Sequence, residues 1–306
     1  MEKEFNKFCS DIKLTSKQRT DAKLKYRGVA KKLHDKYYET EYNGDTKFLF
    51  GSYKTKTNTR PITEKHDVDL LFKIPDETFQ KFDDYEGNGQ SALLQEIKTV
   101  LNEKYTTTDK IRAWGKVVLV TFADGTHNVE VLPAYEQDDG TFLIPNSENG
   151  GSWDSFDPRS QVVKFQISND KTDGLTGDLT RMIKTWKRNI TTLNYGSYKI
   201  IDDVINFLDS EFENGVDYDE YQNVVLNFFD YLKRNCVSEI KNHSVTAYNR
   251  AAKAIEYYDN DKPKEASEEW RKIFGDLFPL VTVNPVKTNV VKPRGIVAPS
   301  SPWRKF

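Results

Sequence analysis

The sequence predicts an α+β fold in two lobes, a mixed sheet with helices followed by a mainly helical lobe. β-rich apolar segments separated by turn residues fall between residues 48 and 144. From about residue 160 they give way to apolar residues at helical spacing, and the final segment is rich in Pro, Val and Lys. We therefore predict a first lobe over 1–160, a helical lobe over 161–280 and an extended tail over 281–306. A ligand cleft is expected between the lobes.

The composition limits the class of protein. The chain has 306 residues and a formal net charge of -2, which argues against general nucleic-acid binding and does not indicate a nucleic-acid activator. Its two cysteines, Cys9 and Cys236, match no metal-ligand spacing and are expected to be reduced thiols. The sequence shows no signal peptide and no apolar segment of membrane-spanning length. We expect a cytoplasmic protein without a membrane partner.

The first lobe is expected to open with a long helix over residues 15–42, capped by Thr15 or Ser16. One face of this helix is apolar. The other carries Lys17, Arg19, Lys23, Lys25, Arg27, Lys31 and Lys32. A solvated helix face is the simpler interpretation of these cations, and a surface that binds phosphates is the alternative.

Strands and shorter helices follow this helix. A strand at 48–50 turns at Gly51-Ser52 into a short helix, and another strand covers 67–74. Ser91 is expected to cap a helix, and a Gly-containing connection joins strands at 116–122 and 128–132 into a hairpin. A further strand covers 141–144, and turn-forming residues predict a surface loop over 145–154. In the second lobe, amphipathic helices are predicted at 179–188, from Tyr198, and at 221–235, 246–259 and 266–274.

Carboxylates gather on two of the predicted strands. Asp67 and Asp69 alternate with Val68 and Leu70, so the two acids share one face of their strand. Glu130 lies between valines on a later strand. Acids side by side on a core strand are costly unless a cation lies between them, and a divalent metal is the usual solution. The simpler interpretation makes Glu130 a surface residue and Asp67 a helix or strand cap.

The strand, the turn and the acids together resemble the polymerase-β-like nucleotidyltransferase superfamily. The resemblance rests on Phe50-Gly-Ser-Tyr53, Arg60-Pro-Ile62 and Asp67-Val-Asp-Leu-Leu71. More narrowly, the chain is similar to the bacterial CD-NTase family of cyclic GMP-AMP synthase- and DncV-like enzymes. Val129-Glu-Val-Leu-Pro-Ala134 is similar to the strand with the third acid, although Asp is commoner there, and Trp270–Pro279 to the C-terminal helix ending.

The resemblance implies roles for single residues. Asp67, Asp69 and Glu130 would be catalytic and bind two Mg²⁺ ions, for which Mn²⁺ could substitute. Gly51 and Ser52 would bind the nucleotide phosphates, together with Lys184 of the motif Ile183-Lys-Thr-Trp186 and Ser197 of Gly196-Ser-Tyr198. Tyr198 would stack on the donor base. Spacing alone leaves other interpretations open, namely Lys184 reaching solvent and Tyr198 in the core.

The implied function is the joining of ATP, GTP, CTP or UTP into a cyclic di- or trinucleotide second messenger for antiphage (CBASS) signalling. Two alternatives remain at this point. One is a linear oligonucleotide synthase, or a transferase that nucleotidylates RNA, protein or a small molecule. The other is a degenerate sensor that binds nucleotide or RNA without catalysis. The extended tail suggests an accessory regulatory protein as a partner.

Overall fold

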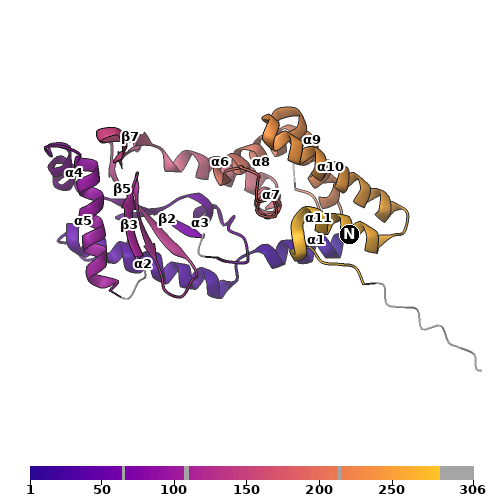
Figure 1. The fold of residues 1–306 in the computed structure, drawn as a ribbon, viewed down its shortest axis with the longest axis horizontal. Coiled ribbons are helices and arrows are strands. Elements are labelled where there is room, and N and C mark those ends of the chain that lie inside the picture. The colour runs from indigo at the N-terminus through magenta and orange to yellow at the C-terminus, as the bar shows by residue number, and fades with distance from the viewer. Residues whose placement is uncertain (64–65, 107–109, 213–214, 283–306) are drawn as a thin grey trace, which may run out of the picture.

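The fold has a sheet-containing lobe and a helical lobe, as the sequence predicts (Figure 1). The structure is a computed structural model and describes residues 1–63, 66–106, 110–212 and 215–282. Most of the predicted tail, residues 283–306, lies outside this range. The boundaries placed at residues 160 and 280 stay predictions.

The sheet of the first lobe brings together strands that are far apart in the sequence. Its order is β1-β2-β5-β4-β3, and β6 and β7 extend it from the end of β5. The parallel pair of β2 and β5 lies at the centre, and the other neighbours are antiparallel. The strands are β1 (Lys47–Leu49), β2 (Asp67–Lys73), β3 (Lys110–Trp114), β4 (Val117–Thr121), β5 (Asn128–Glu136), β6 (Phe142–Asn146) and β7 (Ser152–Phe156).

Two of these strands were not predicted. β3 has only one buried apolar residue, Ile111, so its sequence carries a weak strand signal. β7 falls in and just after the segment 145–154, which was predicted to be a loop. The prediction was wrong there because β7 is stabilised by pairing with β6, a contact that local turn propensity does not report.

Helices pack on the first-lobe sheet. α2 (Ser16–Tyr37) and α5 (Gly89–Lys104) share one apolar cluster with the buried residues of β2, β4 and β5. A capping box at Thr15 and Gln18 begins α2, as the sequence predicts for Thr15. Helix α5 is capped by Asn88 rather than by Ser91, whose backbone N–H is the donor to the Asn88 side chain. The shorter helices of the lobe are α3 (Gly51–Thr55) and α4 (Asp76–Asp83).

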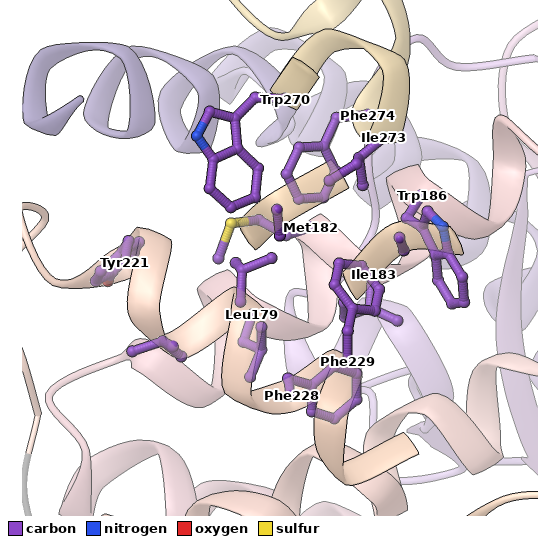
Figure 2. Packing of buried hydrophobic residues seen from close by; sticks show 14 of the residues in the cluster. Leu179, Met182, Ile183, Trp186, Tyr221, Phe228, Phe229, Trp270, Ile273 and Phe274 are labelled. Atoms are coloured by element: carbon purple, nitrogen blue, oxygen red, sulfur yellow. The ribbon is translucent and has the colours of Figure 1, made fainter. Parts of the chain in front are cut away.

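The helical lobe is built around α7 (Leu175–Arg188), whose side chains are almost all buried. Figure 2 shows Leu179, Met182 and Trp186 of this helix between aromatic side chains of α9 and α11. The other helices of the lobe are α6 (Pro158–Lys171), α8 (Ser197–Glu211), α9 (Tyr221–Asn235), α10 (Ser238–Asp259), α11 (Pro263–Phe274) and the short η2 (Gly275–Leu277).

The N-terminal segment belongs to a different core from the one predicted. Residues 2–12 form α1 (Glu2–Ile12), and its Phe5 and Phe8 pack against Trp270, Phe274 and Phe278 of the helical lobe. The sequence prediction placed this segment in the first lobe. Its apolar face gives no indication of which core it joins, because that depends on contacts with residues about 270 positions away.

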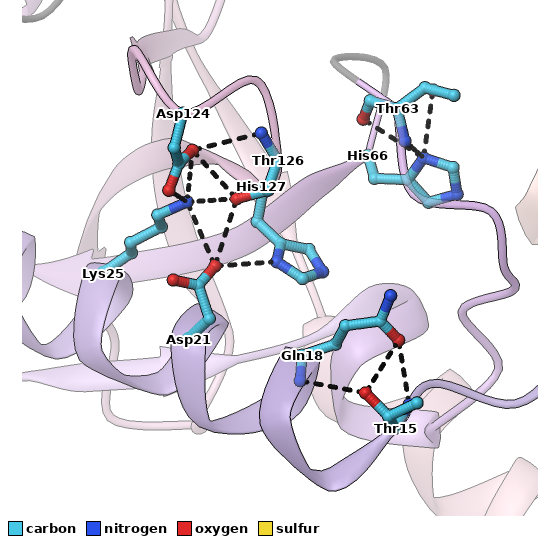
Figure 3. Close-up of polar contacts among 9 residues, drawn as sticks. All are labelled: Thr15, Gln18, Asp21, Lys25, Thr63, His66, Asp124, Thr126 and His127. Atoms are coloured by element: carbon cyan, nitrogen blue, oxygen red, sulfur yellow. Dashed lines mark hydrogen bonds and ion pairs between the residues drawn. The ribbon is translucent and has the colours of Figure 1, made fainter.

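One cation of the long helix is not on a solvated face. Lys25 is buried and pairs with Asp21 at 3.1 Å and with Asp124, in the turn between β4 and β5, at 2.6 Å (Figure 3). It also donates to Thr126. The interpretation of these cations as a solvated face is therefore wrong for Lys25, because the turn after β4 folds over it. Among residues 1–63, 66–106, 110–212 and 215–282, no helix is long and apolar enough to span a membrane.

Lys25→Met is expected to lower the free energy of unfolding by about 1–2 kcal/mol, because it leaves Asp21 and Asp124 without their shared cation. Both acids are partly exposed and can be solvated by water, which limits the loss. Lys23→Met, at an exposed position of the same helix, is the matched control. Urea unfolding followed by circular dichroism measures the difference, and equal midpoints for the two variants would contradict the expectation.

Candidate active site

The two predicted acid-bearing strands lie side by side. β2 and β5 pair in parallel, with Asp69 directly opposite Glu130 and Asp67 opposite Asn128. Along β2, Val68, Leu70 and Phe72 are fully buried, whereas Asp67 and Asp69 stay partly exposed on the other face. The alternation of acidic and apolar residues in the sequence therefore matches the alternation of exposed and buried side chains over residues 67–70 of β2. Three carboxylates from two neighbouring strands reach the same face of the sheet.

Asn128 orients one of these acids. Its side-chain amide donates a hydrogen bond of 3.1 Å to Oδ1 of Asp67, across the strand pair. Asn128 is buried at the beginning of β5 and shares its strand face with Glu130, two residues further on. Sequence analysis assigned no role to Asn128. Its position two residues before Glu130, on the same face of the predicted strand, was the signal that could have identified it.

Gly51 allows the backbone to approach the acids. It begins α3 with φ +58°, in the left-handed region that favours glycine. A Cβ at this position would lie 3.0 Å from Cγ of Asp69 and closer still to one of its carboxylate oxygens. The turn therefore needs glycine for two reasons, the backbone conformation and the space that the Asp69 carboxylate occupies.

Gly51→Ala is expected to displace the Asp69 carboxylate, to lower catalytic turnover at least about tenfold and to cost about 1–2 kcal/mol of unfolding free energy. Gly125→Ala is a matched control, because Gly125 has φ +65° and a Cβ at that position would meet no atom within 4 Å. Gly125→Ala therefore introduces the same kind of backbone strain as Gly51→Ala, but no close contact with another side chain. Catalytic turnover and thermal unfolding, measured side by side, separate the two effects, and equal turnover in both variants would exclude displacement of Asp69.

Lys184 of α7 reaches from the helical lobe to the Gly51-Ser52 turn. Its Nζ donates to Oγ of Ser52 at 2.7 Å and to Oγ1 of Thr57 at 2.9 Å. The alternative in which Lys184 only reaches solvent is therefore not what the structure shows. Thr57 is a member of this cluster that sequence analysis missed, because a threonine in a Thr-rich segment carries no distinguishing signal.

Two further cations on the same face of α7 hold the segment that follows Ser52. Arg181 donates to the backbone carbonyl of Lys56 at 2.8 Å. Arg188 donates to the carbonyl of Arg60 at 2.5 Å and to Oγ1 of Thr59 at 3.2 Å. Positions 181, 184 and 188 are three and four residues apart, so they form one helical stripe. This stripe positions residues 52–61 against the helical lobe.

Burial and charge act strongly on the central groups. Burial, with Glu130 and Asp67 nearby, raises the pKa of Asp69 to about 7, although Lys184 opposes this. Burial, with Asp67 nearby, also raises the pKa of Glu130. Burial lowers the pKa of Lys184 to about 7, with Asp69 opposing and Arg181 adding to the shift. Burial is the largest cause of all three shifts, and repulsion from neighbouring acids adds to it at Asp69 and Glu130.

A cavity of about 660 Å³ opens between the two lobes at these residues. Of the predicted site residues, it is lined by Asp67, Asp69, Ser52, Lys184 and Ser197. The remaining lining side chains come from 57–66 of the first lobe and 187–200 of the helical lobe, with Arg188 and Asn194 among them. A cavity of this size lies within the usual range of small-molecule sites.

Three predicted residues lie beside this cavity rather than in its lining. Gly51 approaches the Asp69 side chain closely, and Glu130 lies directly opposite Asp69 on β5. Tyr198, next to Ser197 at the beginning of α8, has an exposed fraction of 65% and faces a smaller depression with Gln161 and Asp202. It is therefore not a core residue. The structure brings seven of the eight predicted residues to one region and leaves the Tyr198 ring at its margin.

The donor set fits a hard divalent cation. Carboxylates are the ligands that Mg²⁺ prefers in proteins, and burial together with repulsion between these acids raises the pKa values of Asp69 and Glu130. In the present geometry, no three His, Cys, Asp or Glu side chains within the described ranges are close enough together to chelate an ion. The fit therefore rests on the chemistry and register of Asp67, Asp69 and Glu130.

Parallel acid-bearing strands, a Gly-Ser turn and a lysine from a second, helical lobe define a nucleotidyltransferase. Residues 1–169 match the family model of the Second Messenger Oligonucleotide or Dinucleotide Synthetase (SMODS) domain, and the chain belongs to this family of CD-NTases. It is 23% identical, over 286 residues, to a Bacillus cereus strain VD146 protein that is named a probable cyclic nucleotide synthase. The match covers 78% of this chain and 83% of that protein.

Solved structures show the same fold. CdnC of E. coli MS115-1, solved in complex with HORMA-deltaN, superposes with a TM-score of 0.66 at 16% identity, over 91% of this chain and 98% of that one. Vibrio cholerae DncV, a cyclic AMP-GMP synthase solved with the linear intermediate 5′-pppA(3′,5′)pG, superposes with a TM-score of 0.65 at 12% identity. That match covers 90% of this chain and 95% of the other. The predicted polymerase-β-like CD-NTase fold and the enzyme class are thus confirmed.

Proposed function

We propose that this protein joins nucleoside triphosphates into a cyclic di- or trinucleotide. The observation that carries the proposal is the register of Asp69 with Glu130, beside Asp67, at a cavity that Lys184 and Ser52 also line. A cyclic product is favoured by the curated relative's name and by the linear intermediate bound to DncV. Both are properties of those proteins, and they motivate the proposal here.

The acidic face would hold the metal. Asp67, Asp69 and Glu130 would bind two Mg²⁺ ions, with Mn²⁺ as a substitute. When bound, the ions supply a lower pKa for the attacking sugar hydroxyl and neutralise the charge on the leaving pyrophosphate. Asn128 keeps Asp67 oriented through its hydrogen bond. Gly51 leaves space for the Asp69 carboxylate.

Lys184 and Ser52 would bind the triphosphate. Lys184 already donates to Ser52 and Thr57, so its ammonium group and the Ser52 hydroxyl are positioned together for phosphate oxygens. Ser197, at the beginning of α8, would add a further donor. Tyr198 would stack on a base that extends out of the cavity, since its ring is exposed there.

A mixture of labelled ATP, GTP, CTP and UTP tests the proposal. With MgCl₂ present, we expect a product that resists phosphatase, because a ring has no terminal phosphate. Mass spectrometry gives its bases and ring size, and specific nucleases distinguish 2′–5′ from 3′–5′ linkages. A phosphatase-sensitive oligonucleotide would instead indicate a linear synthase. Nucleotide binding without pyrophosphate release for any base combination would indicate a binding protein.

Antiphage signalling and an accessory protein are also proposed. CdnC was solved with HORMA-deltaN, and a comparable partner of this chain would contact the Lys- and Pro-rich segment after Pro279. That segment lies mostly outside the described residues. Phage challenge of cells that carry this gene with its neighbouring genes, with and without Asp69→Asn, tests the role in defence. Pull-down with a chain lacking residues 285–306 tests the role of the segment, and unchanged partner capture would contradict it.

A further inference from the structure

Thr57 belongs to the wall of the nucleotide cavity, but its side chain is fully buried. Its hydroxyl is therefore not placed to contact a bound nucleotide directly. It is nevertheless one of two groups in the described part of the chain that accept a hydrogen bond from the Lys184 ammonium group, at 2.9 Å, and the other is the Ser52 hydroxyl, at 2.7 Å. A role of Thr57 in nucleotide binding would therefore act through Lys184.

The hydrogen bonds around Thr57 run in one direction. Oγ1 of Thr55 lies 3.0 Å from the carbonyl oxygen of Gly51, which only accepts, so the Thr55 hydroxyl donates its single proton there. Oγ1 of Thr57 lies 2.9 Å from Oγ1 of Thr55, and Thr57 is therefore the donor in that contact. Thr57 in turn accepts from Lys184, which only donates. The chain of donors thus ends on the backbone of Gly51.

This order leaves two protons for a ligand. Lys184 has three N–H donors, and two of them are used by Ser52 and Thr57. Ser52 accepts from Lys184, and no acceptor in the described ranges takes the proton of its own hydroxyl. Both side chains line the nucleotide cavity. One N–H and one O–H, on atoms 2.7 Å apart, are a suitable pair of donors for phosphate oxygens.

The backbone places Thr57 independently of its side chain. Helix α3 ends at Lys56, which has φ +56°, and the N–H groups of Lys56 and Thr57 both donate to the carbonyl of Ser52. Arg181 of α7 donates to the carbonyl of Lys56 at 2.8 Å. Loss of the Thr57 hydroxyl would therefore leave the turn in place and remove one of the two acceptors of Lys184.

We propose that Thr57 is a positioning residue, whose hydroxyl holds the Lys184 ammonium group beside the Ser52 hydroxyl so that both donate to one phosphate group. Without this hydroxyl, Lys184 keeps a single acceptor at the end of a flexible stem, and its ammonium group would spread over several positions. The role in nucleotide binding rests on the proposed function, whereas the contact between Thr57 and Lys184 does not.

Thr57→Val tests the role, because it removes the hydroxyl and keeps the shape of the side chain. The ligand is α,β-methylene-ATP, a substrate analogue that cannot release pyrophosphate, and calorimetry on the full chain with Mg²⁺ measures its affinity. We expect Thr57→Val to weaken binding about tenfold, Thr57→Ala to do the same, and Thr57→Ser to bind within about twofold of the unmodified protein. Unchanged affinity in Thr57→Val and Thr57→Ala would overturn the proposal.

Thr176→Val is the matched control. Thr176 is also fully buried, and its hydroxyl contacts two other hydroxyls, those of Ser168 at 2.8 Å and Thr172 at 2.9 Å. None of these three residues lines the nucleotide cavity. Thr176→Val should therefore bind the analogue as the unmodified protein does, and a tenfold loss in this variant as well would mean that any buried hydroxyl has the same effect.

A double-mutant cycle with Lys184→Met separates positioning from a general structural effect. If Thr57 acts through Lys184, adding Thr57→Val to Lys184→Met should weaken α,β-methylene-ATP binding by less than about twofold more. A further tenfold loss in the double variant would overturn the positioning role, because the hydroxyl would then act without the ammonium group.

A crystal structure of Thr57→Val without nucleotide tests the contact by itself. The Lys184 ammonium group is expected to leave its position beside the Ser52 hydroxyl, and an unmoved ammonium group would overturn the proposal. If the unmodified protein bound no α,β-methylene-ATP at all, the proposed function would fail instead. The crystal structure would still decide whether Thr57 positions Lys184.

Discussion

Asp69→Asn is expected to lower nucleotide joining by more than about 10³-fold, with Mg²⁺ or Mn²⁺ present. Asp69 is the central acid, because it lies directly opposite Glu130 and two residues from Asp67. A cation bound by either neighbour would therefore also bind to Asp69. Removing it costs several kcal/mol of transition-state stabilisation, and about 1.4 kcal/mol corresponds to a factor of ten. Pyrophosphate release and product formation by mass spectrometry are the measurements. Normal turnover in this variant would refute the assignment of the acids.

The same substitution is expected to stabilise the metal-free protein. The pKa of Asp69 is raised from 3.8 to about 7 in the fold, so the native state holds its proton more tightly than the unfolded state does. The contribution of Asp69 to the free energy of unfolding is therefore fully present below about pH 4. It is lost as the pH rises through about 7. In EDTA at pH 8, Asp69→Asn should unfold with a free energy roughly 1–3 kcal/mol higher than the unmodified protein.

The controls separate catalysis from folding. At pH 4 the two proteins should have similar stability, because residue 69 is then uncharged in the native state of both proteins. Asp139→Asn, at an exposed position before β6, should show neither the loss of turnover nor the gain in stability at pH 8. A destabilised Asp69→Asn protein at pH 8 would mean that the carboxylate has a structural role.

Lys184→Met is expected to lower turnover per bound nucleotide and nucleotide affinity together, reducing kcat/KM about 10²-fold. The ammonium group donates to Ser52 and lines the same cavity as Asp67 and Asp69, so its removal takes a charge-assisted contact from the triphosphate. Burial lowers the pKa of Lys184 to about 7, so a neutral isostere costs little in stability. Initial rates over a range of ATP concentrations, with thermal unfolding alongside, measure both quantities.

Two further variants interpret the result. Lys184→Arg keeps the charge but not the paired contacts to Ser52 and Thr57, and should recover part of the activity. Lys264→Met removes a lysine from the surface of α11 and should behave as the unmodified protein. If Lys184→Met kept full kcat/KM, its contacts to Ser52 and Thr57 would serve only to join the two lobes.

The local sequence pattern was sufficient to predict the strand that carries Asp67 and Asp69. The alternation of Asp67 and Asp69 with Val68 and Leu70 predicted both the strand and its exposed face, because side chains alternate along any strand. Helix α9 was predicted with its bounds, Tyr221–Asn235, because its apolar spacing is strong. β3 and β7 were missed, because their stability comes from strands that they pair with rather than from their own residues.

The sequence by itself determined the acidic strand faces, the Gly51-Ser52 turn and the succession of a sheet lobe and a helical lobe. It could do so because these features depend on spacing within a few residues. Only the tertiary structure decided that Asp69 lies opposite Glu130, that Lys184 holds Ser52 and Thr57, that α1 joins the helical core and that Tyr198 stands exposed. Those outcomes depend on pairing register and on packing between residues far apart in the chain, which no local pattern encodes.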